Sequence, residues 1–492
     1  MSISPISGNG QVVGASELQE RYLAFPNISY AEFQRLPEEL RMNIVSKNRI
    51  LQTDTYNRFM NHIKGTDWNK KEVYVLQMRK AADGYLIVNG LQTQLEKVFG
   101  MPIAQAELDF ADEFYKTANV PFFNKEMWQG VIDDHQGRLP INVHAVQDGT
   151  AILTGDPVLR VEGPGELAAH FEADFHRLFY QTLVATTAHK INELVGANRF
   201  IEVGKRSTPT EEMHLQATRA MYEGGGITLS SNDAAAACFK EIKDVGTVGH
   251  RLIQHYEDEE TSFETIIQGS DKSTLLVDLV NSMSGIEKVL ALKQKYRASG
   301  KVIWLRLDSG NLKDLTKYIL QRFQELGFTD PKLDKVVVED LSNPEEMKEI
   351  DIAMKDAGYD PINHVIYGAG GLLVFTKKGR SDASTGYKLS EVDGAPKMKF
   401  SDSPGKESLP GKPEIVYLDG KRIIAQENEF PNAESTFRLA VEMGKVTSST
   451  QDSEAVRKTV KASYAALTLG TPTERSPKTN EMIGDLTKAY FD

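Results

Sequence analysis

Polar and glycine residues follow four successive strand-like segments in the middle of the chain. Asp278 ends the first segment, Arg306 and Asp308 end the second, Asp340 ends the third, and the glycines of YGAGG (367–371) end the fourth. Carboxylates hold metal ions or sugar hydroxyls, a guanidinium binds anions through a planar fork, and glycine N–H groups can surround an anion. These residue types predict an active site if the fold brings the four strand ends together.

A histidine in an unusual context lies upstream of these segments. In GTVGHRLIQHYEDEE (246–260), His250 follows two glycines and a threonine and precedes a dense acidic run. Two interpretations are open from these residues alone. A tight turn holds the imidazole for chemistry, or His250 merely begins a helix.

The elements that position these residues repeat a strand-then-helix pattern. Apolar runs predict strands, and amphipathic stretches between them predict helices. The strands are expected at 273–282, 301–310, 335–340 and 364–371, and the helices at 285–299, 311–328 and 342–360. Such repeats predict parallel strands with right-handed crossovers, whose C-terminal ends converge on one mouth. An aspartate after a strand can instead cap the next helix, but recurrence at successive strands favours the mouth.

Composition excludes several classes of protein. The 492 residues allow two or three domains, and 40% hydrophobic with 26% charged residues is typical of a globular chain. A net charge of -12 argues against a surface for nucleic acid or anionic lipid. The single cysteine, Cys238, excludes an internal disulfide, and neither a secretory signal nor a membrane-length apolar run is evident. We therefore expect a cytoplasmic protein that binds neither nucleic acid nor membrane.

Segments spread along most of the chain, taken in order, resemble the nicotinate phosphoribosyltransferase family. They are TDTY (53–56), RVEGP (160–164), QTLVATTAHKI (181–191), VGKR (203–206), GTVGHRLIQHYEDEETSF (246–263), LVDLVNSMSG (276–285), RLDSGN (306–311), ED (339–340), YGAGGLLV (367–374) and YKLSEVDGAPKMKFSDSPGKESLPGK (387–412). The resemblance covers roughly residues 40 to 430. The sister family of nicotinamide phosphoribosyltransferases shares most of these segments.

The resemblance implies an α/β fold: the irregular α/β barrel of type II phosphoribosyltransferases with a second α/β domain built from the N- and C-terminal segments. We expect a flexible arm at 1–30, a β-rich α/β domain at 31–175 and 386–492, and a catalytic barrel at 176–385. The family is a homodimer whose partner subunit completes each site. Its reaction transfers ribose 5-phosphate from phosphoribosyl pyrophosphate to a pyridine nitrogen with Mg²⁺, and couples ATP hydrolysis to turnover through a phosphohistidine.

Matching the family's motifs assigns the catalytic residues. His250 corresponds to the phosphorylated histidine, which needs a neutral nitrogen aimed at the γ-phosphate of ATP and a carboxylate on its other nitrogen. Asp278 is the candidate for that carboxylate. Asp278 and Asp308 are also suited to hold Mg²⁺, so the two tasks compete for Asp278. Arg206 and Arg306 suit pyrophosphate or the pyridine carboxylate.

The remaining substrate-binding residues follow from the same motifs. Asp340 is suited to ribose hydroxyls, and Ser309 with Gly310 belongs to the RLDSGN motif. Gly370 and Gly371, with the nearby Lys377 and Lys378, are expected to hold the 5-phosphate.

An aromatic residue is expected to stack on the pyridine ring. Tyr56 matches the tyrosine that the neighbouring subunit contributes in this family, although TDTY alone reads as a helix start capped by Asp54 or Thr53. On the opposite face, Val203 stands where the nicotinamide enzymes have phenylalanine. That departure puts a two-sided aromatic sandwich in doubt.

The residue that faces the ring substituent decides between acid and amide. A serine hydroxyl donates to a carboxylate, whereas an aspartate accepts from an amide and repels a carboxylate. In TLSSNDAAAA (228–237), Ser231 and Asn232 match the nicotinate pattern. If the match shifts by one residue, Asp233 approaches the position that the nicotinamide enzymes fill with an acid. SDSPGKESLPGK (401–412) favours nicotinate, and RLPINVHAV (138–146) weakly favours nicotinamide. We expect nicotinate.

A third interpretation belongs to another class. The chain could be a catalytically silent pyridine-nucleotide binder that has kept the barrel and lost turnover. A silent binder has no need of a phosphorylatable histidine, so the retention of His250 beside Asp278, Arg306, Asp308 and Asp340 argues for an enzyme.

Overall fold

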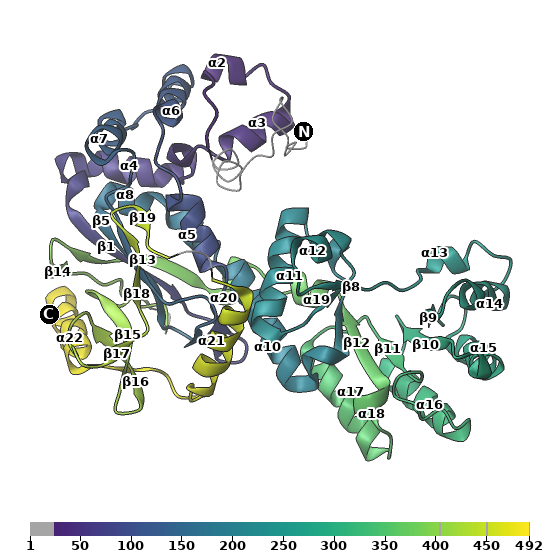
Figure 1. Cartoon of the computed structure of the whole chain (residues 1–492). Helices are drawn as coiled ribbons and strands as arrows, with labels where there is room; N and C mark the ends of the chain where they lie inside the picture. Colours follow the sequence, from purple (N-terminus) through teal and green to yellow (C-terminus); the bar gives the residue numbers. More distant parts are fainter. Residues whose placement is uncertain (1–23, 403–404, 449–450, 492) are drawn as a thin grey trace. The chain divides into compact units, whose positions relative to one another are not determined.

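The computed structural model describes residues 24–402, 405–448 and 451–491 (Figure 1). The chain divides into two compact units. Unit 1 comprises Met1–Tyr180, Gly379–Asp452 and Lys461–Asp492, and unit 2 comprises Gln181–Lys378 and Ser453–Val460. The arm expected at 1–30 lies outside the described residues up to residue 23. The domain boundaries expected from the sequence stay a prediction.

Unit 1 contains an antiparallel sheet that both ends of the chain build. Its order is β14-β13-β1-β5-β3-β18-β19. The strands are β1 (Lys71–Met78), β3 (Asn142–Ala145), β5 (Pro157–Pro164), β13 (Thr385–Val392), β14 (Ala395–Pro396), β18 (Arg438–Glu442) and β19 (Lys445–Val446). Asp-Gly and Gly-Asp-Pro turns separate the strands in sequence, as expected for hairpin-rich segments. This confirms the second domain built from N- and C-terminal segments.

Two smaller sheets complete unit 1. They pair β2 (Tyr85–Ile87) with β4 (Ala151–Leu153), and join β15 (Pro413–Leu418), β16 (Lys421–Gln426), β17 (Glu434–Ser435) and β20 (Glu474–Arg475). The helices before the barrel are α2 (Tyr30–Phe33), α3 (Glu38–Val45), α4 (Thr55–Lys64), α5 (Leu91–Phe99), α6 (Gln105–Thr117), α7 (Lys125–His135), α8 (Gly165–His170) and α9 (Glu172–His176). Those after it are α20 (Arg380–Ala383), α21 (Ser453–Ala465) and α22 (Pro477–Phe491).

A buried histidine in unit 1 makes stability depend on pH. His170 is 4% exposed, packs against Trp128 and Phe171, and donates from Nε2 to the Arg49 carbonyl at 3.0 Å. Burial lowers the pKa of His170 to about 4. Between pH 6.5 and about 4, His170 is therefore protonated in the unfolded chain but neutral in the native state. The free energy of unfolding falls as the pH falls through this window.

Replacing His170 with glutamine should flatten that pH dependence, because the glutamine amide keeps an N–H donor and does not titrate. The His170→Gln variant should lose about 2–3 kcal/mol less stability than the wild type between pH 7 and pH 4.5. Urea unfolding at the two pH values measures the difference. His135→Gln, at an exposed helix end, is the control. Equal pH slopes in the wild type and His170→Gln would contradict the assignment.

Unit 2 contains a seven-stranded parallel sheet of order β8-β7-β6-β12-β11-β10-β9. The strands are β6 (Phe200–Glu202), β7 (Leu229–Ser230), β8 (Lys243–Asp244), β9 (Lys272–Leu276), β10 (Val302–Leu307), β11 (Val336–Val338) and β12 (Val365–Ala369). The last four confirm the strands expected from the sequence. Strands β8 and β9 are consecutive in the chain yet form the two edges, so the sheet is an open barrel and the segment with His250 joins its edges.

Helices cover the outside of this sheet. They are α10 (Phe179–Val195), α11 (Glu211–Gly225), α12 (Asp233–Cys238), α13 (His250–Ile253), α14 (Glu259–Gly269), α15 (Ser282–Lys295), α16 (Leu312–Glu325), α17 (Pro344–Asp356), α18 (Pro361–His364) and α19 (Gly371–Val374). Figure 1 shows α14 to α17 following one another beside strands β9 to β12. In the described residues, no helix combines the length and apolar character needed to cross a bilayer.

The interior of the sheet is an apolar cluster contributed by several strands. Ile201, Val337 and Ile366 form its centre, and Leu229 of β7 and Trp304 of β10 pack against it. Because each strand from β7 to β10 contributes a member, the cluster runs across this whole face of the sheet. The strand registers place Arg306 beside Val337 on this inner face.

Asparagines, and not the aspartates, cap the helices that follow these strands. The N-cap residues Asn281, Asn311 and Asn343 each accept a helical backbone N–H on the side-chain oxygen. Each lies three positions after an aspartate at a strand end. The alternative interpretation of those aspartates as caps is therefore wrong.

Candidate active site

His250 lies at the start of α13 and faces a carboxylate across the open side of the barrel. Its Nε2 is 3.2 Å from Oδ1 of Asp278, which follows β9. Oδ2 of Asp278 accepts the Ser309 hydroxyl at 2.5 Å. The imidazole is 38% exposed, whereas the Asp278 side chain is only 4% exposed. With the Nε2 proton directed at Asp278, Nδ1 keeps a free lone pair, which is the arrangement that a nucleophilic histidine needs.

Arg306 of β10 connects the histidine segment to the sheet. Its NH1 donates to the Thr247 hydroxyl at 2.6 Å and to the Val248 carbonyl at 3.4 Å. Its NH2 lies 3.1 Å from Asp308 and 2.8 Å from Glu339. The terminal N–H groups of the fork are thus all engaged, and the buried Nε lacks a partner among the described residues. A substrate anion at this fork can use Nε and must share NH2 with Asp308 and Glu339.

Glu339 is a member of this site that the motifs did not single out. Its side chain is 6% exposed, and burial raises the pKa of its carboxyl, while the facing Arg306 opposes the rise. Asp308 adds to the rise, and Arg206 opposes it. Glu339 lies two residues after Val337 and therefore on the inner face of the sheet. This position in the strand register could have identified Glu339 as a site residue, but only once the pairing of the strands is known.

Ser231, Asn232 and Asp233, the three candidates to face the ring substituent, follow β7 and differ in position and exposure. Glu202 pairs with Ser230, so Ser231 continues the inner face of the sheet, and its side chain is exposed. Asn232 is fully buried. Asp233 begins α12 and is exposed. Ser231 is therefore the one of the three residues that lies on the inner face of the sheet.

The amide of Asn232 has no capacity left for a substrate. Its Nδ2 donates to Glu211 at 2.8 Å and to Nδ1 of His214 at 2.8 Å. Its Oδ1 accepts from Lys205 Nζ at 2.9 Å and from the Ala234 N–H at 3.0 Å. Two donors and two acceptor positions are thereby used. Asn232 acts as a structural residue that holds the loops after β6 and β7.

A buried carboxylate and imidazole support the same loops. Glu202 and His214 are fully buried, and Nε2 of His214 donates to Glu202 Oε1 at 3.0 Å. The other Glu202 oxygen accepts the Ser230 hydroxyl at 2.6 Å, and the Gly204 N–H also donates to Glu202. His214 sits on α11 without a local motif, so sequence reasoning had no signal for this network.

The ends of β6 and β12 approach each other through glycines. A Cβ on Gly370 would lie 2.9 Å from Gly204 Cα, and one on Gly204 would lie 2.7 Å from the Val374 side chain. Gly370 is thus required for close backbone packing, in addition to the anion role expected for it. Gly371 has open space, since the nearest atom to its Cβ would be the Ser207 hydroxyl at 3.7 Å.

The other predicted residues of unit 2 are distributed around the same strand ends. Arg206 is exposed in a single helical turn (Lys205–Ser207) after β6, and Gly310 has a φ of +90° that favours glycine. Asp340 and Lys377 are exposed and adopt the left-handed backbone conformation, which is uncommon outside glycine and concentrates at functional sites. Lys378 is buried and donates to the Leu372 and Thr376 carbonyls, so its ammonium holds its own loop.

Tyr56 belongs to unit 1, on α4. The helix begins after Asp54, whose side chain makes no capping hydrogen bond. Tyr56 is 45% exposed, and its hydroxyl donates to Glu172. Burial and the Glu172 carboxylate raise the pKa of the phenol. The ring is therefore held at its hydroxyl end, with part of its surface available for stacking.

A cluster of cations lies near the Glu172 carboxylate that accepts from Tyr56. Lys388 lies 3.9 Å from Glu172, and burial together with Arg79, Arg380 and Lys399 lowers the pKa of its ammonium. The buried Nε and NH2 of Arg79 make no hydrogen bond among the described residues. Four cations with two nearby carboxylates, Glu172 and Glu407, and unpartnered guanidinium N–H groups suit a polyanion such as a phosphate chain. The sequence motifs did not indicate this cationic cluster.

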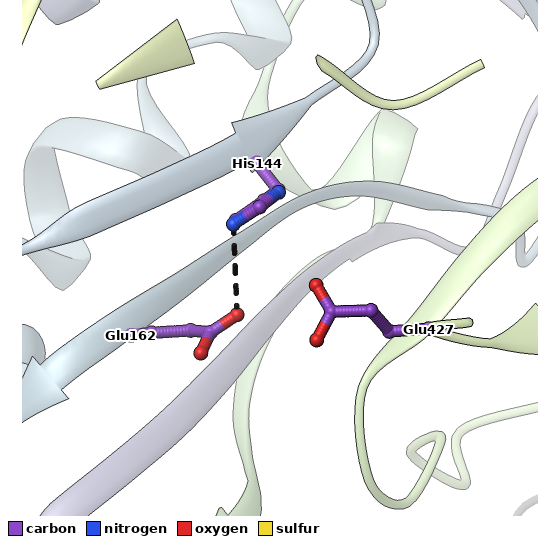
Figure 2. Close-up of side chains that lie close together, drawn as sticks. All are labelled: His144, Glu162 and Glu427. Atoms are coloured by element: carbon purple, nitrogen blue, oxygen red, sulfur yellow. Dashed lines mark ion pairs between the residues drawn. The ribbon is translucent and has the colours of Figure 1, made fainter. Parts of the chain in front are cut away.

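One further group in unit 1 has the composition of a metal site. His144, Glu162 and Glu427 point toward one another (Figure 2). Arg160 donates to both carboxylates, at 2.8 Å for Glu162, and Lys412 lies 2.7 Å from Glu162. Burial and Arg160 lower the pKa of His144, which lies 3.8 Å from Glu162. Since two cations already neutralise the two carboxylates, we interpret this group as an ion-pair network.

The chain is similar to known proteins over most of its length. Residues 48–143 match the family model described as nicotinamide phosphoribosyltransferase, N-terminal domain. The nicotinate phosphoribosyltransferase of Bacillus subtilis is 27% identical over 388 residues, covering 77% of this chain and 74% of that protein. The one of Dictyostelium discoideum is 24% identical over 469 residues, covering 84% and 76%.

Solved structures agree in fold. Human nicotinic acid phosphoribosyltransferase superposes with a TM-score of 0.66 at 19% identity, covering 89% of this chain and 100% of that one. Nicotinate-nucleotide pyrophosphorylase from Pyrococcus furiosus gives a TM-score of 0.62 at 17% identity, covering 89% and 99%. The open parallel barrel and the second domain are thus the type II phosphoribosyltransferase fold. Together with the matched segments, these comparisons show that the chain is similar to nicotinate phosphoribosyltransferases over most of its length and shares their fold.

Proposed function

We propose that this protein is a nicotinate phosphoribosyltransferase of NAD biosynthesis and salvage. It forms nicotinate mononucleotide and pyrophosphate from nicotinate and phosphoribosyl pyrophosphate, and couples ATP hydrolysis to the reaction. The observation that carries the proposal is the His250–Asp278 pair, 3.2 Å apart, joined through the Thr247–Arg306 contact to the inner face of the barrel. A phosphohistidine mechanism needs this combination of an oriented imidazole and a linked substrate site.

In the proposed mechanism, His250 Nδ1 attacks the γ-phosphorus of ATP while Asp278 holds the Nε2 proton; the bond to the β,γ-bridging oxygen breaks, ADP leaves, and water later hydrolyses the phosphohistidine to free histidine and phosphate. The Nε2–Asp278 contact also stabilises the positive charge that develops on the ring. Arg206 and Lys377, both exposed at strand ends, take up charge on the departing pyrophosphate and on the 5-phosphate. Asp340 accepts hydrogen bonds from ribose hydroxyls, and Gly371 leaves room for the phosphate beside its N–H.

Mg²⁺ fits the carboxylates at this mouth. Asp308 is 22% exposed and bonds to Arg306 through Oδ1, which leaves Oδ2 available as a ligand. Both oxygens of Asp278 have protein partners, so we assign the metal chiefly to Asp308 and the orienting role chiefly to Asp278. One or two carboxylates suffice, because Mg²⁺ takes its other ligands from water and substrate phosphates. Bound there, the ion would neutralise charge on the leaving pyrophosphate.

We further propose a homodimer in which each unit 1 completes a partner's site. Tyr56 would stack on the pyridine, and the cations Arg79, Arg380, Lys388 and Lys399 would bind phosphate groups. The support is the exposed apolar face of α4, where Phe59 is 49% and Ile63 is 69% exposed. The expected cytoplasmic location stays a prediction.

Ser231 is the residue that we expect to select the acid. Its replacement by aspartate should lower kcat/KM for nicotinate by about 100-fold and raise the relative use of nicotinamide, because a carboxylate repels the acid and accepts from the amide. Ser299→Asp adds the same charge before β10 and is the control. Unchanged discrimination in Ser231→Asp would remove Ser231 from the ring site.

A product assay tests the proposed function directly. Purified protein receives phosphoribosyl pyrophosphate, Mg²⁺ and ATP, with nicotinate and nicotinamide in separate reactions. Faster formation of nicotinate mononucleotide supports the proposal. Faster formation of nicotinamide mononucleotide would establish the sister activity, for which the family model matching residues 48–143 is named. Formation of neither product would favour a silent pyridine-nucleotide binder.

A further inference from the structure

The geometry points to Glu339 as a specificity-determining residue that competes with the substrate carboxylate for Arg306. Its negative charge lowers the ratio of kcat/KM for nicotinate to kcat/KM for nicotinamide. This inference rests on the proposed function. Glu339 Oε2 lies 2.8 Å from Arg306 NH2, one of the nitrogens through which a guanidinium pairs with a carboxylate.

The first argument concerns hydrogen-bond capacity. Arg306 directs NH1 at Thr247 and Val248 and NH2 at Asp308 and Glu339, which leaves the Nε proton as its one unpartnered donor. A bidentate carboxylate needs two parallel N–H groups. Binding through Nε and NH2 therefore requires the incoming carboxylate to share or replace a bond that Asp308 or Glu339 now receives.

The second argument concerns charge. Arg306 already faces two carboxylates, Asp308 at 3.1 Å and Glu339 at 2.8 Å. A nicotinate carboxylate adds a third negative group, whereas the nicotinamide substituent adds none. Because Glu339 is almost fully buried, its repulsion of the acid is weakly screened by solvent.

The third argument concerns space. A Cβ on Gly368 of β12 would lie only 2.7 Å from Glu339 Cγ, so the Glu339 side chain packs directly on the neighbouring strand. The carboxylate is thereby kept beside Arg306 when a substrate arrives. Asp308 differs, because it is 22% exposed and is the proposed metal ligand. Glu339 is the partner of Arg306 that has no other assigned task.

Glu339→Gln tests the inference, since glutamine keeps the shape and an acceptor oxygen but removes the charge. We expect the ratio of kcat/KM for nicotinate to kcat/KM for nicotinamide to rise about tenfold, equivalent to about 1.4 kcal/mol. The change should appear mainly as a lower KM for nicotinate with kcat little altered. Isothermal titration of the same protein with each pyridine should show the same shift in the ratio of Kd values.

Two further variants make the test decisive. Asp351→Asn is the control: it breaks the buried ion pair between Asp351 of α17 and Arg199, whose charged groups are 2.6 Å apart. Arg199 precedes β6, at the opposite end of the strand from the candidate site, so the variant should lower stability without changing the ratio of kcat/KM values. Glu339→Asp keeps the charge but retracts it by one methylene, and should give a smaller rise; it carries the test if Glu339→Gln does not fold. An unchanged or lower ratio in both Glu339 variants overturns the inference. A wild type that forms neither mononucleotide refutes the proposed function instead, and the titration then decides the inference.

Discussion

Replacing His250 with alanine is expected to abolish ATP-coupled turnover while leaving slow, ATP-independent nucleotide synthesis. Without the His250 imidazole, the proposed acceptor of the γ-phosphate is missing, so pyridine-stimulated ATP hydrolysis should fall at least about 100-fold. The Asp278–Ser309 contact at 2.5 Å does not involve His250 and should persist in the variant. Phosphate release and mononucleotide formation, measured in the same reaction, give the coupling ratio.

Two comparisons sharpen this prediction. His255→Ala removes an exposed histidine five residues downstream, one that makes a ring contact with Tyr256, and should leave the coupling ratio unchanged. Asp278→Asn should resemble His250→Ala in ATP hydrolysis, because an amide can donate to Nε2 and favours the tautomer in which Nδ1 carries the proton. Retention of wild-type coupling by His250→Ala would exclude the phosphohistidine mechanism.

Local sequence patterns were sufficient for four of the seven strands in the parallel sheet and for the helices between them. Strands β9 to β12 and helices α15 to α17 are formed by apolar runs and amphipathic stretches whose periods are read directly from the residues. Parallel pairing followed because each strand is buried and is followed by a helix. The convergence of Asp278, Asp308 and Asp340 at one edge was therefore predictable, since it depends only on strand direction.

The parts of the site that depend on register were not predictable in the same way. Glu339 and Asp340 are adjacent in sequence, yet the strand register places Glu339 against Arg306, while Asp340 is exposed after a left-handed turn. Which of two neighbours faces inward is decided by a one-residue shift in pairing. The same reasoning applies to Ser231 and Asn232, where a one-residue shift decides between an exposed hydroxyl on the inner face and a buried structural amide.

Long-range contacts account for the remaining omissions. The cationic cluster brings Arg79 of the N-terminal segment beside Arg380, Lys388 and Lys399 of the C-terminal segment. It forms because β1 pairs with β13, a contact between strands some 300 positions apart. Single-sequence periodicity carries no information on such pairs, so a cluster of this kind appears only once the sheet order is known.

Removing Arg306 should have the largest effect of any substitution in the barrel on stability and activity together. Arg306→Ala leaves Glu339 buried beside Asp308 without their cation, and it releases Thr247 from the sheet. Loss of one partner of a buried pair costs about 3–5 kcal/mol. Urea unfolding should show this loss, and kcat/KM for nicotinate should fall at least about 100-fold. Arg322→Ala, which removes a surface partner of Glu287, should change stability much less than Arg306→Ala.

The double variant Arg306→Ala/Glu339→Gln separates the two causes of that loss. Neutralising Glu339 removes the unpaired buried charge, so the double variant should recover about 1–3 kcal/mol of stability relative to Arg306→Ala. Activity should not recover, because Thr247 stays detached and the ring site still lacks its guanidinium. Recovery of neither property would mean that Arg306 acts through packing alone. Recovery of stability without activity would establish that one arginine both neutralises the barrel interior and holds the His250 segment in place.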